Sequence, residues 1–141
     1  MINDKLKMTG AVSIALNGEV VREIPNLVVT TGKNFVASRM KDTTKAAMTH
    51  MSVGTDNTAA AAGQTALVSE AARGALTSTT VTANAIAYVE TFAAGTGTGA
   101  LVEAGLFNAS SGGDMLCRTV FAVVNKGSAD SMTITWTITV S

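Results

Sequence analysis

The stretch SMTITWTITVS, residues 131–141, alternates apolar and hydroxyl side chains without a break. Successive side chains of a β-strand point to opposite faces of the sheet, so this period of two predicts a strand with two different faces. Apolar side chains such as Ile134, Trp136 and Ile138 form one face, which we expect to be buried. The other face is all Ser and Thr and carries no charge. Such a strand would span about 35 Å. Without Lys, Glu or Pro to discourage pairing, it needs strands or another chain beside it.

Alternation near the N-terminus predicts a β-hairpin. Apolar residues alternate with polar or small ones from Leu6 to Leu16, and Asn17-Gly18 follows. Asn-Gly favours a type I′ turn, because both of its central positions need a positive φ. The return strand is expected from about Glu19 to Ile24, where Pro25 stops it. Its apolar residues do not alternate strictly, which indicates a β-bulge.

One short helix is expected, over about Lys33 to Lys41, where the spacing of the apolar residues gives the helix one apolar face. A helix of this length must pack on a sheet to be stable. Turns rich in Gly, Ser and Asn separate the remaining segments, which indicates a sandwich or a closed barrel. We expect one mainly β domain over residues 1–141, with residues 1–7 as an arm. The further expected strands are Met48 to Val53, Leu76 to Thr82, Ile86 to Phe92, Leu101 to Asn108 and Met115 to Asn125, and a helical turn is considered near Leu67 to Ala72.

Composition and charge exclude several classes of function. Charged residues make up 14% of the chain, against about 25% in ordinary soluble proteins. Ten basic and ten acidic residues leave no basic excess for nucleic acid. No window approaches eighteen apolar residues, so no membrane span is expected. The start, Met1 to Lys7, is too polar for a signal peptide, and Cys117 is the only cysteine, so we expect synthesis in a cytoplasm without disulfides. A neutral, charge-poor surface favours association with other subunits.

Residues that carry catalytic chemistry are few. His50 is the only histidine, and no Ser lies in a G-x-S-x-G turn. Cys117 lies in an apolar strand with Arg118 on the opposite face, so no base is expected beside its thiol. Glu90 and Glu103 are considered as neighbours on adjacent strands, a carboxylate pair of the kind that glycosidases use, although nothing in the sequence fixes their distance.

Binding motifs are equally weak. The glycines of GTGTG, residues 95–99, precede a strand, whereas a phosphate-binding loop precedes a helix. Asp56 and Asn57 offer oxygen atoms to calcium, but two residues do not make a site. The sequence therefore predicts no enzyme, no cofactor and no metal site.

Six short stretches carry a family resemblance through their order along the chain. They are NLVVTTG (26–32), MSVGT (51–55), TAL (65–67) with Glu70 and Arg73, EAGLFN (103–108), MLCRTVF (115–121) and ITWTI (134–138). Together they resemble a group of small virion structural proteins of tailed bacteriophages. Within that group, the chain is most similar to capsid cement or decoration proteins.

The resemblance implies an antiparallel, jelly-roll-like β-sandwich that stabilises the phage capsid shell. Its expected partners are the major capsid protein and further copies of itself, as a dimer or trimer. Its expected location is the capsid surface of the virion, after assembly in the bacterial host cytoplasm. Two alternatives remain: a tail- or fibre-associated virion adaptor, and a carbohydrate-binding β-sandwich module. Exposed aromatic residues would favour the carbohydrate-binding module, yet aromatic residues are only 4% of the chain.

Two segments are candidates for contact with the capsid or with a second copy. The first is the N-terminal segment, with Ile2, Lys5 and Leu6, because chain ends are often mobile until they are bound. The second is the loop from Gly54 to Gly63, because long loops without a pattern are often functional or disordered. The alternative is that both are ordinary solvent-exposed segments. The candidate residues of the loop are Thr55, Asp56 and Asn57.

Overall fold

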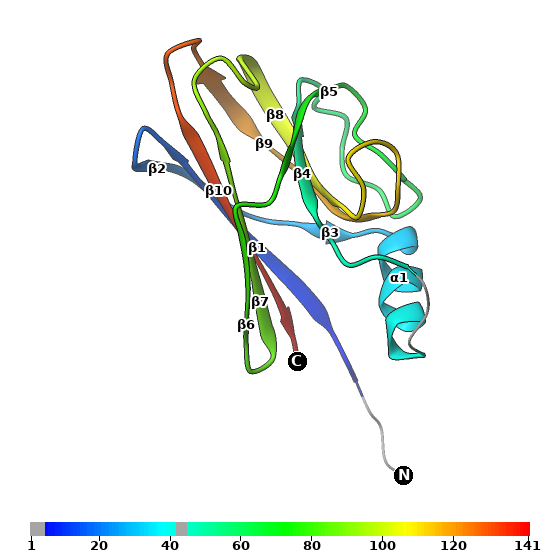
Figure 1. Ribbon diagram of the computed structural model, residues 1–141. Helices are drawn as coiled ribbons and strands as arrows, with labels where there is room; N and C mark the ends of the chain where they lie inside the picture. The colour runs from blue at the N-terminus through cyan, green and yellow to red at the C-terminus, as the bar shows by residue number, and fades with distance from the viewer. Residues whose placement is uncertain (1–4, 42–44) are drawn as a thin grey trace.

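Two five-stranded antiparallel sheets pack as a sandwich in the computed structural model of the protein, which describes residues 5–41 and 45–141 (Figure 1). Sheet A has the strand order β2-β1-β10-β7-β6, and sheet B has the order β3-β9-β8-β4-β5. The prediction of a mainly β sandwich with one short helix is confirmed. The elements are β1 (Met8–Leu16), β2 (Glu19–Pro25), β3 (Leu27–Val28), α1 (Thr30–Met40), β4 (His50–Gly54), β5 (Glu70–Ala75), β6 (Ser78–Thr82), β7 (Ala85–Phe92), β8 (Gly99–Phe107), β9 (Met115–Lys126) and β10 (Met132–Val140).

Strand β10 forms the centre of sheet A, between β1 and β7. Trp136 is fully buried, and it lies opposite Val12 of β1 and Tyr88 of β7. The apolar side chains of β10 point into the core between the two sheets, as their alternation predicts. The Ser and Thr side chains therefore lie on the outer face of sheet A, which points away from sheet B.

The N-terminal hairpin forms as the sequence predicts. Asn17 and Gly18 have φ values of 51° and 84°, the left-handed conformation that a type I′ turn needs at both central positions. The pairing of β1 with β2 shifts register between Ile14 and Ala15, where a bulge was expected. Arg22 of β2 donates hydrogen bonds to the carbonyls of Ala122 (2.9 Å) and Val123 (2.7 Å), which joins the sheets at one side.

Helix α1 begins at Thr30 rather than Lys33. Its N-cap, Val29, makes no side-chain capping bond, so the sequence lacks the usual starting signal. Packing against β9 explains the earlier start. A Cβ atom on Gly32 would collide with the carbonyl group of Leu116, so glycine lets the first turn lie against this strand. Phe35 then extends into the main core.

The segment before β6 also differs from the expectation. Residues 70–75 form strand β5 instead of a helical turn, because they pair with β4, with Ala72 opposite Val53. The single strand expected from Leu76 to Thr82 is shorter, and it begins at Ser78. The chain passes here from sheet B to sheet A. The strands expected over residues 101–108 and 115–125 correspond to β8 and β9, which pair antiparallel across the loop between them.

The two sheets differ in what covers their outer faces. The outer face of sheet B carries a second apolar cluster, in which Leu67 packs with Val29, Phe107 and Met115. Leu67 belongs to the segment 55–69 that connects β4 with β5, so this segment covers the outer face of sheet B. The equivalent face of sheet A has no covering segment among the described residues.

Candidate functional site

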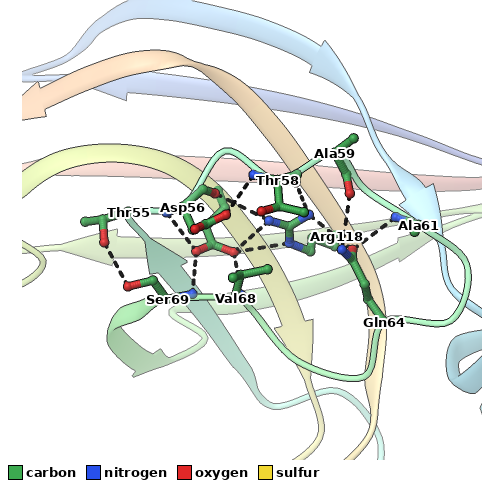
Figure 2. A network of polar contacts seen from close by, with 10 residues as sticks. Thr55, Asp56, Thr58, Ala59, Ala61, Gln64, Val68, Ser69 and Arg118 are labelled. Carbon is green, nitrogen blue, oxygen red and sulfur yellow. Dashed lines mark hydrogen bonds and ion pairs between the residues drawn. The ribbon is translucent and has the colours of Figure 1, made fainter.

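The segment 55–69 contains the three loop residues that the sequence suggested for partner contact, and a buried carboxylate holds it in place (Figure 2). Glu103 of β8 accepts hydrogen bonds from three backbone N–H groups of the segment. The donors are Asp56 (3.1 Å), Val68 (2.9 Å) and Ser69 (2.9 Å). The carboxylate thereby ties both ends of the segment to one point on sheet B.

Arg118 of β9 completes this anchor from the neighbouring strand. Its Nε and Nη2 atoms donate to Oε1 of Glu103 at 3.1 and 2.9 Å, and both side chains are fully buried. Its Nη1 atom donates to the carbonyl of Thr58 (2.8 Å) and to Oε1 of Gln64 (3.1 Å). A buried charge is tolerated only when it is paired and hydrogen-bonded, and both conditions are met here. Because these donors are committed to Glu103 and to the segment, Arg118 holds the segment against sheet B.

Further bonds give the segment a defined shape. Thr58 donates its backbone N–H to Oδ1 of Asp56 at 2.7 Å, and hydrogen bonds from Thr58 hold the pKa of Asp56 below its ordinary value. Gln64 accepts from the N–H of Ala61 and donates to the carbonyl of Ala59. The sequence predicts a long loop without a pattern here, but in the structure the segment 55–69 has a defined conformation and covers the outer face of sheet B. Glu103 and Arg118, which hold it, lie far away in the sequence.

The candidate contact residues fall into two separate places. Thr55, Asp56 and Asn57 follow β4, and both Thr55 and Asn57 are exposed. Lys5 and Leu6 precede β1, and the side chain of Leu6 is 74% exposed. Leu6 lines a shallow groove of about 490 Å³ beside α1, whereas Asp56 contacts Glu103 on sheet B. Ile2 lies outside the described residues.

The acidic residues considered as a catalytic pair belong to different sheets. Glu90 is on β7 of sheet A and Glu103 is on β8 of sheet B, so the two are not neighbours on adjacent strands. Burial raises the pKa of Glu90. The thiol of Cys117 is fully buried in the core, and burial raises its pKa well above the ordinary value, which disfavours a reactive thiolate.

The described residues include neither a cluster of metal ligands nor a helix that could span a membrane. Residues 5–41 and 45–141 contain no group of three or more His, Cys, Asp or Glu side chains placed to hold a metal ion. Within the same part of the chain, no helix has the length and apolar character needed to cross a membrane.

Among the described residues, the outer face of sheet A contains none of the contact residues suggested by the sequence. Strand register places Thr135 between Ser13 and Val89, and Thr137 between Ala11 and Ala87. Small, uncharged side chains therefore stand in rows across β1, β10, β7 and β6, and the rows continue onto β2 at Val20, Glu23 and Pro25. We call this surface the threonine face. It comprises Thr9, Ala11, Ser13, Ala15, Val20, Glu23, Pro25, Ser78, Thr80, Thr82, Ala85, Ala87, Val89, Thr91, Thr133, Thr135, Thr137 and Thr139.

Glu23 is the only charged member of the threonine face, and it lies on the edge strand β2. A shallow groove of about 480 Å³ runs over β1, β2 and β10, where Ala11 and Ser13 leave a depression beside Thr135 and Thr137. The alternation of β10 predicts the central row of this surface. The rows on the neighbouring strands depend on register, which the sequence does not reveal.

The chain was compared with protein-family models, with curated proteins and with solved structures, and none of the three comparisons found a match.

Proposed function

We propose that this protein is a structural component of a tailed-bacteriophage virion, a cement or decoration protein that binds and stabilises the capsid shell. The observation that carries the proposal is the threonine face, a broad and nearly uncharged sheet surface with no cover among the described residues. The order of the six family-like stretches in the sequence supports the phage assignment.

The chemistry of the threonine face favours a protein partner. Phosphate-rich ligands need basic side chains, and this face offers none among its members. Thr, Ser, Ala and Val have short side chains, so they lose little rotamer entropy when another surface covers them. Five strands of about eight residues present a face of about 600 Å², close to one side of a standard protein interface.

A cement role also explains why weak contacts suffice. The uncharged face provides shape and hydroxyl groups but no strong ion pairs. One such contact gives modest affinity, but many copies linked to each other and to the shell act together through avidity. Each copy then needs a stable fold more than a tight individual site, and the buried Glu103–Arg118 pair holds the segment 55–69 in place on the opposite sheet.

The two alternatives are separable. The only Trp and the only Tyr are buried, with Trp136 at 0% and Tyr88 at 7% exposure, so neither presents a ring on which a sugar could stack. A tail- or fibre-associated adaptor would use similar surfaces but in a handful of copies per particle, whereas a cement protein is present in hundreds.

The test is retention on particles after a change on the threonine face. Thr135→Arg places a charge at the centre of the face, and Val123→Arg places the same charge on β9, where Val123 is already 43% exposed. Circular dichroism verifies that both variants fold. We expect Thr135→Arg to lose at least tenfold in copies retained on capsids, and Val123→Arg to be retained like the wild type. Equal retention of both folded variants would overturn the assignment of the threonine face.

A further inference from the structure

The four sheet edges are protected to very different degrees. Edge strand β2 carries three charged residues and ends at Pro25, and its pairing with β1 contains a bulge. Edge strand β5 carries the ion pair between Glu70 and Arg73, and its pairing with β4 is also irregular. Edge strand β3 has only two residues before α1 begins. Charges, proline, bulges and short length are the devices that prevent edge strands from pairing with other chains.

Strand β6, by contrast, has none of these devices. Its sequence is STTVT, and all five residues are exposed. It pairs with β7 in an uninterrupted register, and Figure 1 shows it at the outer edge of sheet A. The surrounding sequence is also free of charge, because residues 74–89 contain no Asp, Glu, Lys or Arg. Val81 is 68% exposed. A strand of this composition, rich in residues that favour β structure, readily accepts a further strand.

We propose that β6 pairs antiparallel with β6 of a second copy, which joins two sheets A into one continuous ten-stranded sheet around a two-fold axis. This deepens the self-association expected of a cement protein by naming its interface, and it extends the threonine face across both copies. In this sense it rests on the proposed function, although the pairing can be measured on the free protein.

The register follows from symmetry. With Thr80 on the axis, Thr79 lies opposite Val81 of the second copy, and Ser78 lies opposite its Thr82. Thr80 and Thr82 are on the threonine face, so hydroxyl groups meet hydroxyl groups there. On the other face, the exposed Val81 then has Ile86 of β7 on one side and Thr79 of the second copy on the other. Five paired residues form about four main-chain hydrogen bonds in an antiparallel ladder.

The charge pattern selects a second copy as the occupant. A strand that lies against itself meets its own side chains, so any charge on it would face a like charge across the pairing. β6 and its flanks carry no charge, and the pairing therefore has no repulsion to overcome. β6 offers no charged group by which it could recognise a strand of a different protein. Its Thr and Ser residues instead suit cross-strand pairs with other Thr and Ser residues.

Cysteine cross-linking of the free, full-length protein tests this geometry. Thr80→Cys places two thiols across the axis at a Cα separation of about 4.5–5.5 Å, which suits a disulfide. The native Cys117 does not compete, because it is fully buried. Val20→Cys is the matched control, since Val20 is 55% exposed on β2, the protected edge of the same sheet. Under mild oxidation with diamide, we expect Thr80→Cys to form linked dimers at least tenfold faster than Val20→Cys.

Sedimentation velocity provides the second measurement. The wild type is expected to show a concentration-dependent dimer, and Val81→Lys, a change at an exposed position, is expected to stay folded and monomeric. A wild type that remains monomeric at high micromolar concentration, or equal cross-linking rates of the two cysteine variants, would overturn the pairing. If such a monomer still occurs in hundreds of copies on particles, the proposed function stands and only the β6 interface fails. Cross-linking of Thr80→Cys to a different protein on particles, without linked dimers, would also overturn it.

Discussion

Removing either member of the Glu103–Arg118 pair should destabilise the protein severely, but by unequal amounts. Breaking a buried ion pair costs about 3–5 kcal/mol, because the remaining charge stays buried without its partner. In Arg118→Met, the carboxylate of Glu103 keeps three backbone N–H donors from the segment 55–69. Those donors partly stabilise the charge, so we expect a loss near the lower end, about 3 kcal/mol.

Glu103→Met should cost more than Arg118→Met. It leaves the buried guanidinium of Arg118 with only neutral acceptors. It also leaves the backbone N–H groups of three residues in the segment 55–69 without their acceptor. Each orphaned group adds about 1 kcal/mol or more, so we expect a total loss of about 5 kcal/mol or more. The double variant removes both charges, and its loss should be clearly smaller than the sum of the two single losses.

Urea unfolding followed by tryptophan fluorescence measures these losses, because the single tryptophan, Trp136, is fully buried in the native core. Glu103→Gln is a control of matched shape that keeps one carbonyl acceptor. A loss below about 1 kcal/mol for Arg118→Met would contradict the reasoning. So would a double variant whose loss equals the sum of the single losses, because additivity would mean that the two groups do not interact.

Four further predictions address the core, the helix and two titrating groups. Trp136→Ala should cost about 3–5 kcal/mol in urea unfolding, and a loss below 1 kcal/mol would contradict its place in the core. Gly32→Ala should lower the melting temperature strongly because its Cβ would collide with a β9 carbonyl, whereas Gly63→Ala, which meets no atom within 4 Å, should change it little; equal melting temperatures would refute the packing of α1. Burial raises the pKa of Tyr88, the only tyrosine, to about 12, so absorbance at 295 nm should titrate near that pH, and a midpoint near 10 would contradict its burial. Burial raises the pKa of Glu90, so the folded state binds the proton of this carboxyl more tightly than the unfolded state does. The contribution of Glu90 to the free energy of unfolding is therefore present at low pH and is lost as the pH rises through the raised pKa. Glu90→Gln should remove this loss of stability with pH, and the same dependence of unfolding free energy on pH in the variant and the wild type would refute it.

The features that the sequence predicts best are local ones. The alternation around Trp136 depends only on the period of a strand, and Asn17-Gly18 specifies its own turn through two positive φ values. Strand β5 escaped prediction because its sequence, EAARGA, has little β propensity and forms a strand only through its pairing with β4. The helix start escaped prediction because it depends on the close approach of Gly32 to β9 and not on a capping residue.

The candidate site shows the same division. The hydroxyl row of β10 is visible in the sequence, but the threonine face requires the register of β1, β7 and β10, which distant residues determine. Glu103 and Arg118 are fifteen residues apart, on neighbouring strands, and no local sequence pattern predicts that they form an ion pair. Their contact explains why the segment 55–69 is an ordered cover, although its composition is typical of a free loop.

Counting the copies of this protein in purified phage particles tests the central claim most directly. Quantitative mass spectrometry gives its amount relative to the major capsid protein in particles of the phage that encodes it. A cement protein should be present in hundreds of copies per particle, in a fixed ratio to the shell subunits. A handful of copies would contradict the capsid assignment in favour of a tail- or fibre-associated adaptor, and absence from the particle would contradict a structural role in the virion altogether.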